Sequence, residues 1–394
     1  MRASPDPAAE ARALDRLTGV ACRILESRGF ERVEPAILQP AELYLEQLGE
    51  DLRNRTYVFS DPDGEELCLR PDLTLPTCRL YLDQHPEADQ PARLSYHGPA
   101  FRYQTDADDP HRPREFHQIG LESFGADDAI GAEVEVLSTV DTCLASLGAG
   151  GTVIRLGDLG IVRGLIMSID MPARWRRRLL RAFERPEAFR RLLQQLCTGA
   201  APLPSAVPER LLDRLIADDP ARSEERVQEY LDAEGITPVG LRSVGELTES
   251  LLALVEDRRA ARLPGEVAGL IDSLVAIDVP ATDAVTRMRT VLGSRRVELE
   301  GPLGAFERRL DDLERAGLSL RRMRFSAGFG RSFAYYTGFV FQFEVEGKGQ
   351  LGHLAGGGRY DDLLEAAGAP RPVPAVGAAM HSERLLAMVG ERLR

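Results

Sequence analysis

Four short stretches of the chain carry residues that could bind or transform a small polar molecule. In residues 69–74, a carboxylate and a hydroxyl follow a predicted strand. Residues 101–122 and 331–338 combine arginines with aromatic and amide side chains. Residues 355–385 hold a glycine run that leads towards a further strand and a final helix. We therefore take the side chains of these stretches as the candidates for chemistry.

A free amino acid is one ligand that these residues would suit. It needs an anion for its ammonium group, a cation for its carboxylate and a matching partner for its side chain. Asp72 or Glu122 could supply the anion, and Arg331 could supply the cation through a two-pronged guanidinium contact. Tyr336, Tyr360 and Glu122 could hold a polar ring. From spacing alone, an ordinary solvated sheet face with strand aromatics fits equally well.

The alternation of residues along one predicted strand gives more detail to the hypothesis of an amino-acid site. Gln118, Gly120 and Glu122 are spaced by two and therefore project from the same side of the strand. A glycine between two polar residues predicts open space above the sheet, where a small ligand could approach the backbone closely.

The glycine run 356–358 does not fit a phosphate-binding loop. It lacks the GxxxxGK[ST] spacing, and no strand-GxGxxG-helix unit is present. We predict a tight turn there, with close approach of the backbone to a ligand.

Metal and cofactor sites are not expected. The histidines near these stretches show no metal-ligand spacing, and they are His97, His111, His117 and His353. The five cysteines are scattered and odd in number, and they are Cys22, Cys68, Cys78, Cys143 and Cys197. This usage favours reduced thiols and a cytoplasmic location.

Composition and charge narrow the function classes further. The 394 residues are 43% hydrophobic and 28% charged, which is typical of a globular protein with a sizeable core. No apolar run is long enough to cross a membrane, and residues 1–17 do not resemble a secretory signal. The net charge of −13 argues against a nucleic-acid partner, and the arginines in residues 174–178 fit a solvated helix face.

The elements that must position the candidate residues form three segments and an α+β fold. Residues 1–168 alternate helical and strand patterns, with hairpin-length connections that predict a largely antiparallel sheet. Residues 169–300 show only helical spacing and predict an all-helical insertion without identifiable chemistry. Residues 301–394 return to mixed structure.

Taken in order, the four stretches resemble the class II histidyl-tRNA synthetase family. Residues 31–35 look like its dimer-forming motif 1, and residues 101–122 look like motif 2. Residues 331–338 resemble the histidine-specific segment, and residues 376–385 look like motif 3. The resemblance implies the class II antiparallel sheet flanked by helices, and it covers about two thirds of the chain.

The resemblance also implies roles for individual residues of a histidine pocket. Asp72, Thr74 and Gln118 would face the ammonium group, although the family has Glu at the position of Asp72. Arg331 would face the carboxylate, and Glu122 with Tyr336 would face the imidazole. The full candidate set for histidine binding is Asp72, Thr74, Arg102, Gln118, Glu122, Arg331, Tyr335, Tyr336 and Tyr360.

The sequence departs from the synthetase family mainly in the part of the site that binds ATP. Arg102 and Arg384 remain and could touch phosphates, but Gln104 replaces an acid of motif 2 and His381 replaces a glycine of motif 3. Ala334 replaces an aspartate that supports the histidine-specific segment. Adenylation needs positioning and charge stabilisation, so we expect it to be slow or absent. Only residues 386–394 follow motif 3, and we therefore expect no anticodon-reading domain.

This combination is similar to the regulatory subunits of ATP phosphoribosyltransferase, a family related to the synthetases. The resemblance implies a non-catalytic chain with a homodimer core, which joins a short catalytic subunit in a hetero-oligomer. Such a chain activates that subunit and mediates feedback inhibition by histidine. The alternative is a shortened synthetase-like enzyme that forms histidyl-adenylate.

Overall fold

The computed structural model describes most of the chain, and it divides the chain into two compact units. The described residues are 7–42, 44, 53–104, 113–183, 185–198, 209–217, 222–236, 243–259, 262–330, 335–347 and 352–393. Unit 1 consists of Met1–Val162 and Leu274–Arg394, and unit 2 consists of Arg163–Ser273. No helix of the described residues is long and apolar enough to span a membrane.

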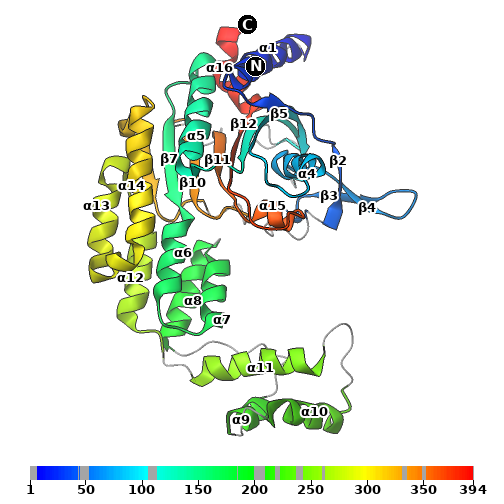
Figure 1. Cartoon of the computed structure of the whole chain (residues 1–394), viewed down its shortest axis with the longest axis vertical. Helices are drawn as coiled ribbons and strands as arrows, with labels where there is room; N and C mark the ends of the chain where they lie inside the picture. Colours follow the sequence, from blue (N-terminus) through cyan, green and yellow to red (C-terminus); the bar gives the residue numbers. More distant parts are fainter. Residues whose placement is uncertain are drawn as a thin grey trace, which may run out of the picture. The chain divides into compact units, whose positions relative to one another are not determined.

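A nine-stranded sheet forms the centre of unit 1 (Figure 1). Among its described strands, the pairs β1–β5 and β7–β9 are parallel and the other neighbours are antiparallel, which confirms the predicted largely antiparallel sheet. In spatial order the strands are β1 (Glu31–Arg32), β5 (Ala92–Phe101), β6 (Glu115–Phe124), β12 (Ala375–His381), β11 (His353–Arg359), β10 (Phe339–Glu344), β7 (Val153–Asp158), β9 (Met323–Ser326) and β8 (Asp278–Pro280).

Helices cover both faces of this sheet. Helices α1 (Pro7–Ser27), α5 (Ala129–Ser146) and α16 (Ser382–Leu393) pack on one face, and α4 (Thr74–Gln84) and α15 (Leu363–Ala366) pack together against the other. Gly29 follows the end of α1, and its φ of 80° places it in the left-handed region that favours glycine. The α4 face of β6 carries Gln118, Gly120 and Glu122, so it is the face that holds the candidate site.

A second, three-stranded sheet, β2-β4-β3, follows β1 along the chain. Its strands are β2 (Leu38–Pro40), β3 (Tyr57–Ser60) and β4 (Glu66–Leu69). In the turn between β3 and β4, the Asp61 carboxylate accepts hydrogen bonds from the backbone N–H groups of Asp63 and Glu65 at 2.9 Å. This sheet and its flanks hold five of the seven large apolar side chains that are exposed among the described residues, namely Ile37, Leu38, Val58, Phe59 and Tyr103.

Unit 2 is helical, as the sequence predicts. Its described helices are the later part of α6 (Leu159–Ser168), then α7 (Ala173–Ala182), α8 (Pro186–Thr198), α9 (Glu209–Ala217), α10 (Ser223–Ala233), α11 (Val244–Arg259) and most of α12 (Gly265–Val275). A leucine-rich core that includes Leu212, Leu231 and Leu254 joins α9, α10 and α11. The arginines 174–178 lie on α7, whose Trp175 and Leu179 are buried.

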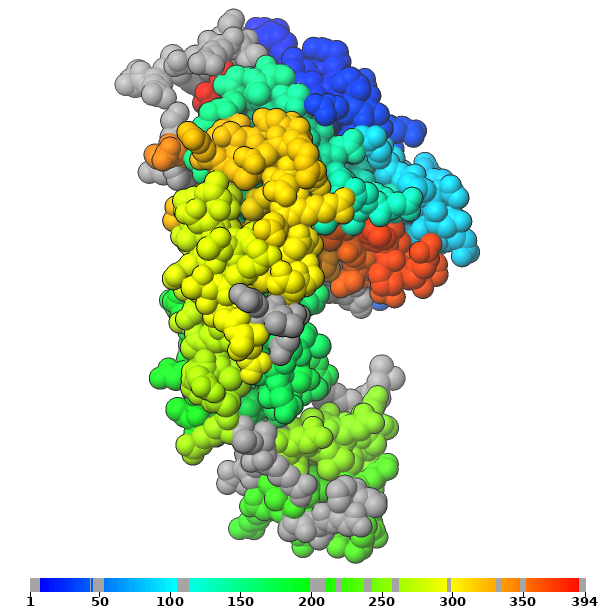
Figure 2. All heavy atoms as spheres, turned by 60° about the vertical axis from the view of Figure 1, so that its left-hand side comes forward, coloured from blue at the N-terminus to red at the C-terminus, as the bar shows by residue number. Residues whose placement is uncertain are grey.

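The end of the helical unit differs from the predicted segment 169–300. Residues 274–300 group with unit 1, because β8 pairs with β9 and extends the nine-stranded sheet. Two helices complete this region, α13 (Ala281–Leu292) and α14 (Glu300–Arg315), with a short 3-10 turn between them, Gly293–Leu299. They pack side by side (Figures 1 and 2).

The glycine run corrects a prediction. Residues 356–358 lie inside β11, between β10 and β12, and not in a turn. A Cβ atom at Gly357 would lie 2.3 Å from the Gly377 carbonyl oxygen, and one at Gly358 would lie 2.6 Å from the Phe339 carbonyl oxygen. The glycines therefore allow close packing of neighbouring strands, and the groups that approach them belong to the protein itself.

A buried network of charges fastens α14 and α5 to the sheet. Arg309 on α14 donates hydrogen bonds to Glu133 on α5 at 2.5 Å and to Asp158 on β7 at 3.1 Å. Arg359 on β11 donates to the other Glu133 oxygen at 2.5 Å and to Asp361 at 2.8 Å. Glu133 is 1% exposed and is shared by both arginines, so three segments distant in sequence, α5, α14 and β11, meet at one carboxylate, and Asp158 adds β7 through Arg309.

Candidate functional site

Glu122 is the centre of the candidate site. It lies on β6, is completely buried, and accepts hydrogen bonds on both carboxylate oxygens. The Tyr96 hydroxyl donates to Oε1 at 2.9 Å, and the Tyr360 hydroxyl donates to Oε2. Burial raises the pKa of Glu122 to about 7, even though the two tyrosine hydroxyls act in the opposite direction.

Gly377 makes room for this carboxylate. It lies on β12 directly opposite Glu122 in the register. A Cβ atom at this position would lie only 1.4 Å from Glu122 Oε2 and 2.8 Å from the Tyr360 hydroxyl oxygen. A side chain of any other residue would therefore expel Glu122 from its present position.

The space above Gly120 is occupied by Tyr96 and not by open solvent. Tyr96 on β5 is paired with Gly120, and a Cβ atom at Gly120 would lie 2.3 Å from the Tyr96 hydroxyl. This corrects the expectation that the glycine leaves space for a ligand. The glycine lets the tyrosine ring lie flat on the strand, and that position brings the Tyr96 hydroxyl to Glu122.

Three further residues of the predicted site are Asp72, Gln118 and Thr74, which provide two hydrogen-bond acceptors and a hydroxyl group. Asp72 is 5% exposed, and its Oδ1 accepts the backbone N–H of Leu75 at 3.3 Å, whereas its Oδ2 is buried without a partner among the described residues. Gln118 is 4% exposed, and its Oε1 is likewise buried without a partner. The Thr74 hydroxyl lies 3.5 Å from the Tyr96 hydroxyl.

The charge state of Asp72 is set by opposing influences. Burial raises its pKa, and Arg102 is the strongest group that opposes the rise. Arg102 itself donates a hydrogen bond to the Pro71 carbonyl oxygen at 2.7 Å, and its guanidinium lies over the Phe116 ring. The structure therefore places Arg102 near Asp72, one of the residues predicted to face the ammonium group.

The three candidate tyrosines gather into one aromatic cluster. The Tyr335 and Tyr336 ring centroids lie 4.8 Å apart, and that of Tyr360 lies 5.8 Å from Tyr335 and 6.4 Å from Tyr336. Burial raises the pKa of all three hydroxyls, so each remains a neutral hydrogen-bond donor. Two of the predicted positions, Arg331 and Ala334, lie outside the described residues.

Two histidines face each other beside the end of β12. His381, at the end of β12, is paired across the sheet with Gln118. Its Nε2 lies 3.1 Å from Nε2 of His353, so one imidazole donates a hydrogen bond to the other. Burial, together with Arg384 and Arg102, lowers the pKa of His353 to about 3, and burial lowers that of His381 well below its usual value. The pair is therefore uncharged at neutral pH and occupies space beside the candidate pocket.

Sequence reasoning missed two residues of this site. Tyr96 and Gly377 carry no motif that separates them from ordinary strand residues. Their roles follow from the register of β5 and β12 against β6, which only the structure supplies.

Comparison with known proteins identifies the class of protein to which this fold belongs. A family model described as histidyl-tRNA synthetase matches residues 6–206 and 249–385. Solved structures agree on the fold. A structure from Bacillus halodurans, described as an ATP phosphoribosyltransferase regulatory subunit/histidyl-tRNA synthetase, aligns with a TM-score of 0.63 at 20% identity, covering 96% of this chain and 79% of that one. A histidine–tRNA ligase subunit from Alicyclobacillus acidocaldarius aligns with a TM-score of 0.58 at 22% identity, covering 100% and 96%. The fold is therefore that of a histidyl-tRNA synthetase-like protein.

The curated relatives narrow this class. The ATP phosphoribosyltransferase regulatory subunit of Brucella anthropi is 32% identical over 369 residues, which is 93% of this chain and 96% of that protein. The protein of the same name from Rhizobium meliloti is 33% identical over 362 residues, which is 91% and 93%. The chain belongs to the family of ATP phosphoribosyltransferase regulatory subunits.

Proposed function

We propose that this chain binds free histidine in the candidate site and, as a non-catalytic subunit, regulates a short ATP phosphoribosyltransferase catalytic chain. It activates that chain and conveys feedback inhibition when histidine is bound. Histidine then must bind one conformation of the assembly better than the other, because that difference in affinity is the whole driving force of the regulation. The family membership supports the partner, and the geometry of the buried site supports the ligand.

The observation that best supports histidine as the ligand is a pair of hydrogen-bond acceptors that lack a donor among the described residues. Asp72 Oδ2 and Gln118 Oε1 are buried and meet no donor among the residues that the structure describes, and such atoms destabilise a protein unless a donor reaches them. An ammonium group has three donors and a positive charge, so it would satisfy both acceptors and would compensate the Asp72 carboxylate. In this proposal Arg331 holds the ligand carboxylate, and Glu122 with Tyr336 and Tyr360 holds the imidazole.

Isothermal titration calorimetry with the full chain and L-histidine tests the ligand. We expect Asp72→Asn to weaken binding by about tenfold or more, because it removes the charge that faces the ammonium group. Asp83→Asn is the matched control, since Asp83 is exposed on the same segment, in α4, and its loss should leave the affinity unchanged. Equal affinity of Asp72→Asn and wild type would contradict the proposal.

The non-catalytic assignment rests on the nucleotide side of the site. Gln104 cannot supply the negative charge of the motif 2 acid, and His381, which is hydrogen-bonded to His353, replaces a glycine of motif 3. We expect no histidine-dependent exchange of pyrophosphate into ATP. Robust exchange would favour the alternative, an enzyme that forms histidyl-adenylate. A cytoplasmic location, and the lack of a nucleic-acid partner, a metal and a cofactor, stay predictions.

The three-stranded sheet β2-β4-β3 supports the homodimer core. Leu38 on β2, Leu67 and Leu69 on β4, and Tyr57 and Phe59 on β3 lie on one face by their register, and Leu38 and Phe59 are 52% and 41% exposed. Exposed apolar groups on this scale mark surfaces that protein partners cover. The sheet directly follows residues 31–35, which resemble a dimer-forming motif, so we assign this face to the contact with a second copy of the chain.

Assembly with the catalytic subunit has a direct test. A short phosphoribosyltransferase chain should co-purify with this protein, gain activity on mixing, and lose that activity when histidine is added. A catalytic chain that is fully active alone, and indifferent to this protein, would overturn the regulatory role.

A further inference from the structure

Arg359 and Tyr360 are neighbours at the end of β11, and they serve opposite faces of the sheet. The register pairs Arg359 with Val376 on β12, and Val376 precedes Gly377, which lies opposite Glu122. Successive residues of a strand project from opposite faces, so Arg359 points away from the Glu122 face. It reaches α5 behind the sheet, whereas Tyr360 donates its hydroxyl hydrogen to Glu122 on the front.

Three hydrogen bonds hold the Arg359 guanidinium on this rear face. It donates to Glu133 at 2.5 Å, to the Ala129 carbonyl oxygen at 2.7 Å and to Asp361 at 2.8 Å. The side chain of Arg359 is 11% exposed and that of Glu133 is 1% exposed. Hydrogen bonds between charged groups are strong and directional when water is excluded, so residue 359 has little freedom to move.

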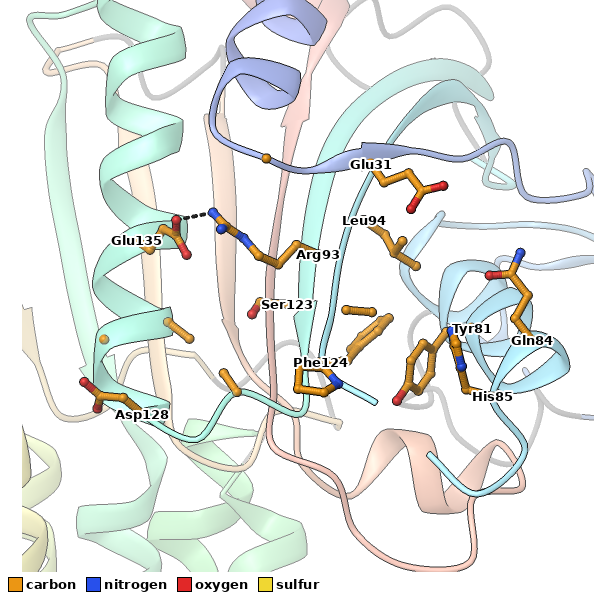
Figure 3. A pocket seen from close by; sticks show the side chains of 16 residues that line it. Glu31, Tyr81, Gln84, His85, Arg93, Leu94, Ser123, Phe124, Asp128 and Glu135 are labelled. Atoms are coloured by element: carbon orange, nitrogen blue, oxygen red, sulfur yellow. Dashed lines mark hydrogen bonds and ion pairs between the residues drawn. The ribbon is translucent and has the colours of Figure 1, made fainter. Parts of the chain in front are cut away.

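Helix α5 is a firm support for this contact, because further ion pairs fix it in place. Beside a pocket on the same face of the sheet, Glu135 of α5 is bonded to Arg93 of β5 (Figure 3). Arg309 of α14 bonds to the other oxygen of Glu133 at 2.5 Å. The carboxylate that Arg359 meets is therefore held from two sides and cannot follow a movement of the strand.

Asp361, on the other side of Tyr360, is bonded to two further segments of the site. Its Oδ1 accepts the backbone N–H of Ala375 at 2.9 Å, at the start of β12. Its own N–H donates to the Thr337 hydroxyl at 3.2 Å, and Thr337 directly follows Tyr336. Tyr360 thus lies between two residues that are bonded to each other and to fixed neighbours, and this arrangement sets the direction of its ring.

We propose that Arg359 is a positioning residue, which holds the Tyr360 hydroxyl against Glu122 through its contact with Glu133 and thereby sets the affinity for the ligand from the rear face of the sheet. The identity of the ligand rests on the proposed function, in which Glu122 and Tyr360 hold the imidazole of histidine. Hydrogen bonds weaken steeply when they are misaligned, so a small rotation of Tyr360 is enough to release Glu122.

A double-mutant cycle on the histidine affinity of the full chain tests this role. Arg359→Lys keeps the charge but removes the planar guanidinium, and it should weaken histidine binding in calorimetry by at least about fivefold. In the Tyr360→Phe background, the same substitution should change the affinity by less than about twofold. Arg322→Lys is the matched control, because Arg322 also bonds to a carboxylate of α5, Asp141 at 2.9 Å, but directly precedes β9, which carries no candidate residue.

The cycle distinguishes positioning from a role in folding alone, which would weaken binding equally in both backgrounds. Glu133→Gln gives a second variant in case Arg359→Lys does not fold. It keeps the shape of the side chain and removes the charge that Arg359 meets. Its effect on the histidine affinity should also vanish in the Tyr360→Phe background.

The titration of Glu122 provides a measurement that needs no ligand. Burial raises the pKa of Glu122 to about 7, and the Tyr360 hydroxyl is the group that opposes this rise most strongly. Release of Tyr360 in Arg359→Lys should raise this pKa further, so the stability that the proton confers should be lost at a higher pH. Urea unfolding of Arg359→Lys, with and without Glu122→Gln, gives the midpoint. A midpoint equal to that of wild type would overturn the inference.

The outcomes separate this inference from the proposed function. Weakening by Arg359→Lys that depends on the Tyr360 hydroxyl supports both. No weakening, or equal weakening in both backgrounds, overturns the positioning role and keeps the histidine site. No binding of histidine to the wild type overturns the proposed function, and the titration of Glu122 then decides alone whether Arg359 positions Tyr360.

Discussion

At the scale of single residues, the protonation of Glu122 links the site to stability. The ordinary pKa of this carboxyl is 4.5, and burial raises it to about 7 in the folded protein. The unfolded chain therefore loses the proton near pH 4.5, while the folded chain keeps it until about pH 7. The stability that the proton confers is fully present below pH 4.5 and is lost as the pH rises through about 7.

Comparison of wild type with Glu122→Gln measures this effect. Between about pH 4.5 and pH 8, the free energy of unfolding of wild type should fall relative to that of the variant by about 3 kcal/mol, and it should level off above that range. Urea unfolding at a series of pH values gives both curves. Parallel curves across this range would show that Glu122 does not titrate as proposed.

At the scale of elements, the pairing of β12 with β6 decides whether the pocket exists. Gly377→Ala would place a methyl group at the position of Glu122 Oε2, so the carboxylate must turn away from Tyr360. We expect a loss of about 1–3 kcal/mol in stability, together with at least about tenfold weaker histidine binding. In Gly356→Ala, on the neighbouring strand β11, the new methyl group would meet its nearest atom at 3.6 Å, so this variant should bind histidine normally.

A second prediction at the scale of elements concerns the stability that the buried ion pairs of Glu133 provide. Arg309→Met would leave one side of Glu133 and Asp158 without a buried cation. Removal of one partner from a buried ion pair costs about 3–5 kcal/mol, which urea unfolding would detect. The adjacent variant Arg308→Met removes ion pairs with Asp128 and Asp312 in which the arginine is half exposed, and its effect should stay below about 1 kcal/mol. Similar effects of the two variants would contradict the importance of the buried network.

At the scale of the whole molecule, the apolar face of the sheet β2-β4-β3 predicts the oligomeric state. The double variant Leu38→Ser and Phe59→Ser removes two of its most exposed apolar groups. We expect analytical ultracentrifugation to show a dimer for wild type and a shift of at least about tenfold in the dissociation constant for the variant. Met167→Ser is the control, because Met167 is 55% exposed on α6, which is not part of this sheet. An unchanged dimer would place the contact elsewhere.

Much of the fold could be predicted because local patterns are strong in this chain. The spacing of leucines indicated the helices of residues 169–300, and the hairpin-length connections indicated an antiparallel sheet. The boundary near residue 273 could not be predicted in the same way. β8 has only three residues, and its membership of the sheet depends on pairing with β9, which lies 45 residues later in the chain.

The sequence alone therefore determined which residue types are available for the proposed histidine site and that Gln118 and Glu122 share one face of β6, since alternation along a strand needs no tertiary information. Only the tertiary structure decided that Tyr96 covers Gly120, that Gly377 makes room for the Glu122 carboxylate, and that Asp72 and Gln118 each keep a buried acceptor that meets no donor among the described residues. The physical reason is the register between strands, which sets distances of a few ångströms between residues far apart in sequence and leaves no trace in local spacing.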